Sequence, residues 1–196
     1  SVFAEERQQT FDNDASSLIH SFGLDIAASD EWTWGGRFEN GVIADPESGD
    51  TDRTAVSLTS GYHNDKTKYS GTIEYRRDQN DIDGDRSTWL MSNNLSYQTS
   101  EDWRMLADVD VAFSDSGLTS DLDADFIELG VGYAYRPVNN DRLNALVRYE
   151  YLSDLAPDDQ LNATRTSSAS DFEQRSHVVS ADAIYDVTPK LAVGGK

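Results

Sequence analysis

The stretch Phe126–Arg136, FIELGVGYAYR, decides the fold, because its side chains alternate in character with a period of two. One parity is entirely apolar or aromatic: Ile127, Leu129, Val131, Tyr133 and Tyr135. The other parity is mixed: Phe126, Glu128, Gly130, Gly132, Ala134 and Arg136. Successive side chains of a β-strand point to opposite faces, so the stretch predicts a strand with one apolar face and one mixed face.

The same alternation recurs on both sides of this stretch. It is clear at 103–113, 143–151 and 179–187, and weaker at 18–26, 32–42, 56–62, 69–75 and 89–97. We expect eight crossings between Leu18 and Val187 and a ninth strand that begins at Leu191. Val2–Thr10 is either a further strand or a lead-in segment, since neither of its parities is apolar.

Charged residues avoid the apolar parity between the turns. They gather on the opposite parity, as Arg37, Glu39, Glu74, Arg76, Arg104, Asp108, Asp110, Glu128, Arg148, Glu150 and Asp182. In a soluble sandwich the charged face meets water and the apolar face forms the core. In a membrane barrel the apolar face meets lipid and the charged face lines the lumen. Alternation alone fits both architectures.

The connections separate the two architectures, because short and long ones alternate along the chain. Short turns are expected at Ser29–Glu31, Asn64–Lys66, Ser100–Asp102, Val138–Asp141 and Thr188–Pro189. Long polar loops are expected at Asp45–Arg53, Asp78–Arg86, Ser114–Asp123 and Asp154–Arg175, and a shorter polar connection is expected at Asp12–Ser16. An up-and-down meander places every second connection at the same end. Outer-membrane barrels have short periplasmic turns and long external loops, so this pattern favours the barrel.

Aromatic residues on the apolar parity flank the short turns. They are Trp32, Trp34, Tyr62, Tyr69, Tyr97, Trp103, Tyr135 and Tyr185. Amphipathic rings are favoured at a membrane–water interface, so we expect these eight residues to form one lipid-interface ring. A second ring is expected near the long loops, from Trp89, Phe113, Tyr149 and Tyr151.

The expected fold class is therefore all-β, an antiparallel up-and-down transmembrane β-barrel that occupies residues 1–196 as a single domain. Single-chain bacterial barrels have an even number of strands and leave no open edge in lipid. We therefore expect at least ten strands, and twelve or more in the whole barrel. The sequence is expected to be incomplete at the C-terminus and also at the N-terminus.

Composition excludes several classes of function. The chain has 196 residues, a formal net charge of -20, 37% hydrophobic residues and no cysteine. Phosphate would be repelled by this charge, so nucleic acid is not an expected partner. The lack of cysteine excludes disulfides, thiolate chemistry and cysteine zinc sites.

Two small groups of residues are candidate chemical sites. The carboxylates Asp78, Asp81, Asp83 and Asp85 resemble a calcium loop in density, but their spacing does not match an EF-hand, so a solvated hairpin tip is favoured. The three histidines are His20, His63 and His177. His177 is adjacent to Ser176, and neighbouring strand residues face opposite ways, so the two cannot form a nucleophile–base pair. We expect no enzyme, no cofactor and no metal.

Three stretches carry a resemblance to a known group of proteins: Gly132–Leu146, Tyr149–Leu155 and Arg175–Asp186. They resemble the C-terminal outer-membrane β-barrel region of large proteobacterial surface proteins, in which long arrays of repeat domains precede the barrel. The resemblance spans most of Trp89–Lys196. It implies the barrel fold, the bacterial outer membrane and, more loosely, an anchoring or export role. In those proteins the strand corresponding to the one at Leu191 continues further.

The function predicted from these observations is a membrane anchor or assembly platform for a larger surface protein of a Gram-negative bacterium. The expected partners are outer-membrane lipid, lipopolysaccharide and additional domains of the same polypeptide or a partner surface protein. A passive, porin-like channel and a soluble all-β binding module are the alternatives. The charged parity either lines a pore or fills a narrow barrel, and the number of strands decides between the two.

Overall fold

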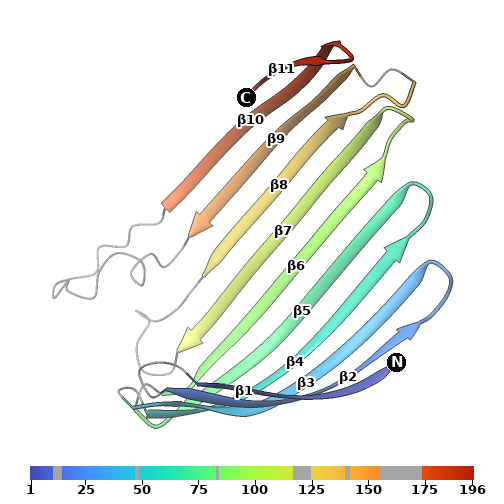
Figure 1. The fold of residues 1–196 in the computed structure, drawn as a ribbon. Helices are drawn as coiled ribbons and strands as arrows, with labels where there is room; N and C mark the ends of the chain where they lie inside the picture. Colours follow the sequence, from blue (N-terminus) through green and yellow to red (C-terminus); the bar gives the residue numbers. More distant parts are fainter. Residues whose placement is uncertain (11–14, 47–48, 83, 117–124, 140–141, 155–173) are drawn as a thin grey trace.

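The protein forms one antiparallel sheet of eleven strands and contains no helix in its described part (Figure 1). The computed structural model describes residues 1–10, 15–46, 49–82, 84–116, 125–139, 142–154 and 174–196. The strands are β1 Val2–Thr10, β2 Ser16–Ala27, β3 Trp32–Asp45, β4 Gly49–His63, β5 Thr67–Asn80, β6 Arg86–Gln98, β7 Trp103–Ser116, β8 Phe126–Tyr135, β9 Leu143–Asp154, β10 Gln174–Thr188 and β11 Leu191–Gly195. No helix in these ranges is long and apolar enough to cross a membrane.

The topology is a simple meander, in which each strand pairs with the strands before and after it in sequence. Strands β2, β4, β6, β8 and β10 end at one end of the sheet, and β1, β3, β5, β7 and β9 end at the other (Figure 1). No described pairing joins β1 to β11, so the sheet remains open between these two strands. The predicted antiparallel up-and-down fold is confirmed, and so is the minimum of ten strands.

One detail of the strand prediction needs correction, and the structure decides one choice that the sequence left open. Nine strands, not eight, lie between Ser16 and Thr188, because each of the nine alternating stretches forms its own strand. The segment Val2–Thr10 is a strand: it pairs with β2 from the Val2–Leu24 pair to the Thr10–Ser16 pair. Backbone pairing holds β1 in the sheet although its side chains show no apolar face.

The strict alternation of short and long connections is also wrong. β3 extends to Asp45 and β4 begins at Gly49, so most of the loop predicted at Asp45–Arg53 is paired strand. β5 likewise continues to Asn80, inside the loop predicted at Asp78–Arg86. The sequence shows where apolar alternation ends, whereas backbone hydrogen bonding continues beyond that point through residues that are polar on both faces.

Side-chain hydrogen bonds fix the tight turns at the other end of the sheet. Asn64 Oδ1 accepts hydrogen bonds from the amides of Lys66 at 2.9 Å and Thr67 at 2.7 Å. Ser29 Oγ likewise accepts hydrogen bonds from the amides of Glu31 and Trp32. Asn and Ser side chains that bond to the backbone two or three residues ahead mimic a turn, which explains why these residues reverse the chain.

The two faces of the sheet differ in exposure, and the apolar face is the exposed one. Val131 and Val147 are 53% and 54% exposed, whereas Ile19 on the opposite face is 4% exposed. In a sandwich the apolar face would be covered by a second sheet, but the described strands form a single sheet. The sandwich alternative is therefore wrong. Large apolar side chains are exposed on this face from β2 to β10, among them Phe22, Leu58 and Val179, and an exposed apolar patch marks an interaction surface.

Candidate pore-lining face

The register of the strands gathers the predicted lumen charges on one face of the sheet, called here the charged face. Residues directly opposite each other in an antiparallel pair share a face. Asp108 lies opposite Gly130, and Gly130 lies opposite Glu150, so this row crosses β7, β8 and β9. The same pairings place all eleven predicted charges on the charged face and leave the eight predicted aromatic residues on the opposite, apolar face.

The charged face is the concave one, because Ser21, Ala55 and Ala112 on it are only 2–3% exposed although the described strands form a single sheet. Side chains from alternate strands also contact each other across it. Arg148 Nη2 on β9 lies 3.2 Å from Asp108 Oδ1 on β7, with β8 between them. Arg37 on β3 lies 3.7 Å from Glu5 on β1, with β2 between them. Small residues stand at both crossings: Gly130 beneath the first pair and Ser21, which is 2% exposed, beneath the second.

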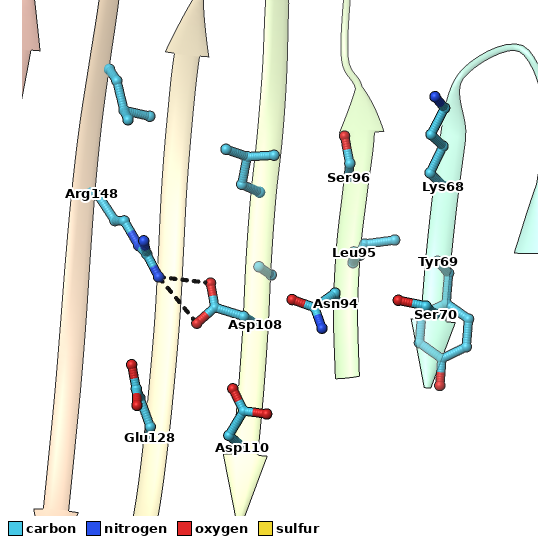
Figure 2. Close-up of a pocket in the computed structure, with 13 residues that line it drawn as sticks. Lys68, Tyr69, Ser70, Asn94, Leu95, Ser96, Asp108, Asp110, Glu128 and Arg148 are labelled. Carbon is cyan, nitrogen blue, oxygen red and sulfur yellow. Dashed lines mark hydrogen bonds and ion pairs between the residues drawn. The ribbon is translucent and has the colours of Figure 1, made fainter. Parts of the chain in front are cut away.

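A hollow of about 570 Å³ opens on the charged face over β5 to β9. Figure 2 shows Arg148 extending toward Asp108 across β8, while Asp110 and Glu128 stand beside each other on β7 and β8. Its border includes Lys68 and Asn94 on the neighbouring strands. Five charged side chains therefore border a hollow that faces away from the apolar surface, together with the apolar side chains of Leu106 and Leu146.

Most arginines of the charged face are held by carboxylates. Arg37 lies 2.8 Å from Glu39 and also donates to Ser21 Oγ at 2.8 Å. Arg76 lies 2.7 Å from Glu74, on the same strand. These contacts fill part of the concave surface with neutralised pairs.

Four other predicted charges have no carboxylate–arginine contact in the described part of the chain. Arg104 donates to the Gln98 side chain at 3.0 Å instead. Asp110 and Glu128 lie directly opposite each other, and Asp182 lies opposite Leu146. The structure places all of these on the charged face; their role in a lumen stays a prediction.

On the apolar face, the aromatic residues form two clusters at the short-turn end of the sheet. Trp32 stacks on Trp34 with ring centroids 5.8 Å apart and contacts Tyr62 at 4.7 Å. Trp103 contacts Tyr135 at 4.7 Å and stacks on Tyr133 at 4.9 Å. Tyr133 was not among the predicted ring residues, although its parity in FIELGVGYAYR already placed it on the apolar face.

The remaining predicted ring residues lie outside these two clusters. Tyr69 Oη lies 2.7 Å from Asn93 Oδ1, which satisfies a polar side chain on the apolar face. Tyr97 and Tyr185 are 41% and 47% exposed. At the other end of the sheet, His177 contacts Tyr149 and Tyr151. That all these rings lie in a membrane interface remains a prediction.

The acidic hairpin tip does not bring its carboxylates together. Asp78 pairs with Arg53 on the charged face, whereas Asp85 pairs with Arg77 on the apolar face. Asp81 is exposed, and Asp83 lies outside the described residues. Among the residues described, no three His, Asp or Glu side chains form a possible metal site.

The histidines lie apart from one another. His20 lies 3.3 Å from Glu6, and His177 Nδ1 lies 2.8 Å from Tyr149 Oη. His63 lies opposite Lys68 on the charged face. Ser176 and His177 are on opposite faces of β10, as the sequence predicted.

Sequence reasoning missed two contributors to the charged face. Glu5 joins Arg37 from β1, a strand to which the sequence assigned no face. Arg53 and Asp78 form a paired contact in segments that were predicted to be loops. The sequence around these residues does not indicate either contact, because both contacts depend on how neighbouring strands are aligned.

Comparison with known proteins gives the following result. Family models give no match, and curated proteins give none either. Among solved structures, an anion-selective porin from Comamonas acidovorans matches with 13% sequence identity and a TM-score of 0.50, over 78% of this chain and 48% of the porin chain. A second chain, from a structure described as "Unveiling the Mechanism Behind the in-meso Crystallization of Membrane Proteins", matches with 14% identity and a TM-score of 0.36, over 98% of this chain and 73% of its own.

This chain thus spans about half the length of the porin that it matches. At 13% identity the match shows the fold alone. The protein has the antiparallel, up-and-down strand arrangement of a porin-type β-barrel wall.

Proposed function

We propose that this chain forms part of the wall of a bacterial outer-membrane β-barrel through which small hydrophilic solutes pass. One observation carries the proposal: the apolar face is exposed on the outside of the curve, and the charged face lines its concave side. Lipid solvates an apolar outer face, and water solvates a charged inner face. The arrangement is the reverse of a soluble β-protein.

The number of strands supports a wide lumen. A barrel of about eight strands is filled by its own side chains, whereas porins with about 16–18 strands leave an aqueous channel. The described part of the chain forms eleven strands, and no described pairing joins β1 to β11. Because single-chain bacterial barrels have an even strand number, closure requires at least twelve strands. Such a barrel is wider than the eight-stranded barrel that its own side chains fill.

An anchor or assembly platform for a larger surface protein is the second candidate. The neutralised pairs of the charged face, such as Arg37 with Glu39, favour it, because a plugged anchor needs an interior of packed, paired charges. Its partners would be outer-membrane lipid, lipopolysaccharide and further domains of the same polypeptide or of a second surface protein. This candidate also rests on the resemblance of residues such as Tyr149–Leu155 to large surface proteins.

Electrical and biochemical measurements on the full-length protein separate these candidates. A gel shift that depends on boiling, in protein recovered from the outer-membrane fraction, is expected of a closed membrane barrel. Stable conductance steps in planar bilayers would then support the channel. A heat-modifiable barrel without conductance would support the anchor. Protein that stays in solution without detergent and shows no gel shift would overturn both.

A further inference from the structure

The positive charge of Arg148, which lines the hollow, is neutralised by two carboxylates. Its guanidinium lies 3.2 Å and 3.3 Å from the two oxygens of Asp108 and 3.0 Å from Glu150 Oε1. The arginine therefore has a carboxylate on the second strand away and another on its own strand. Two partners leave little positive potential to attract a passing anion.

Gly130 makes the longer of these contacts possible. It lies between Asp108 and Glu150 in one row of the charged face, directly under the path from Arg148 to Asp108. A Cβ atom at Gly130 would clash with the carboxylate of Asp108. The neighbouring glycine on the same face, Gly132, has space, because its Cβ atom would meet nothing closer than 3.5 Å.

The carboxylates in the next row of the charged face have no arginine or lysine partner among the described residues. Asp110 and Glu128 lie directly opposite each other in the next row, and no ion pair involves either of them in the described part of the chain. Opposed like charges repel, and mobile cations from solution can compensate them. With the charge of Arg148 neutralised, the potential beside Asp110 and Glu128 is therefore negative. Lys68 stands two strands from β7, at the far border of the hollow.

We infer that Gly130 is a positioning residue that keeps Arg148 bound to Asp108, and that the passage consequently prefers cations to anions. This inference rests on the proposed channel function and adds its solute class: small inorganic cations and solutes with ammonium or guanidinium groups. Rings of Asp and Glu select cations in other channels by the same electrostatics. Loss of the Asp108 contact would leave Arg148 with Glu150 as its one remaining carboxylate partner among the described residues, and would raise anion permeability.

The test is the reversal potential of the full-length protein in planar bilayers under a KCl gradient, near 0.1 M, where the screening length is about 10 Å. Wild type should prefer K⁺. Gly130→Ala changes no charge, yet it should lower the cation-to-anion permeability ratio by somewhat less than the factor of about two expected for one unit charge several ångströms from an ion in water, because it separates the charges of Arg148 and Asp108 without adding one. Gly132→Ala, the matched control, should leave the ratio unchanged.

A second pair of variants tests the inference even if Gly130→Ala does not fold. Asp108→Asn removes one negative charge and frees Arg148 from this partner, whereas Asp110→Asn removes one negative charge and frees no arginine. The inference expects a larger fall in the permeability ratio for Asp108→Asn. Equal falls in these two variants, or an anion preference in wild type, would overturn the inference alone. Complete absence of conductance would overturn the proposed channel and this inference with it.

Discussion

Arg53 on β4 and Asp78 on β5 stand directly opposite each other and form a two-point ion pair. Nε donates to Oδ1 at 2.7 Å and Nη2 donates to Oδ2 at 2.9 Å. Both side chains are largely shielded, at 23% and 17% exposure. The pair joins β4 and β5 beyond Ala55, the last apolar residue of β4 on the charged face.

We predict that Asp78→Asn lowers the free energy of unfolding by about 1–3 kcal/mol, because one oxygen of a charge-assisted, two-point contact is lost and Arg53 stays shielded. Urea titration of the full-length protein in lipid vesicles measures the change. The matched control is Asp85→Asn, which breaks the exposed Arg77–Asp85 pair, 2.7 Å long, at the same end of the sheet. Exposed pairs contribute little, so a control effect as large as that of Asp78→Asn would contradict the prediction.

The Arg77–Asp85 pair gives a prediction about pH. The hydrogen bond from Arg77 lowers the pKa of the Asp85 carboxyl below its ordinary value of 3.8. Since the folded-state pKa is depressed, the stabilisation is complete above the ordinary value and is lost as pH falls through the depressed one. An NMR titration of the Asp85 carboxyl carbon should show this low midpoint. In Arg77→Gln the midpoint should return to the ordinary range; an unchanged midpoint would remove Arg77 as the cause.

The two faces of β8 should respond differently to a new charge. Val131→Arg, and Val147→Arg on β9, put a cation on the apolar face and should cost about 2–4 kcal/mol of folding free energy in lipid, as for charge at the bilayer midplane. Gly132→Arg points to the concave face, where its effect should come from crowding against Leu146. A bilayer-folding titration that finds all three variants equally tolerated would reject the assignment of faces.

Tryptophan quenching tests the two predicted aromatic rings. Trp103 begins β7 at the short-turn end, whereas Trp89 lies near the start of β6 at the other end, where it contacts Tyr75 at 4.9 Å. In single-tryptophan variants inserted in one orientation into vesicles, iodide added to one side should quench Trp103 and iodide on the other side should quench Trp89. Trp32 should follow Trp103, because both belong to clusters at the short-turn end. Quenching of Trp89 and Trp103 from the same side would contradict the rings.

The sequence by itself determined which face of its strand each of these side chains occupies. Period-two alternation is local, so Val131 and Tyr133 fall on one face and Glu128 and Gly130 on the other whatever strands lie beside them. The same pattern predicted an antiparallel meander with more than nine strands, and it located the turns at Ser29 and Asn64, whose side chains bond to the backbone ahead.

Only the tertiary structure decided which charges meet and where the strands end. Arg148 and Asp108 are 40 residues apart, and their contact depends on the alignment of three strands, on the curvature of the sheet and on the absence of a side chain at Gly130. The partnership of Glu5 with Arg37 and the extension of β3 to Asp45 have the same origin. Alternation fixes the face of a residue within its own strand, but neighbouring strands can shift past each other by two residues without changing any face. The register is therefore settled by backbone hydrogen bonds and side-chain contacts across the sheet, which the sequence of one strand does not contain.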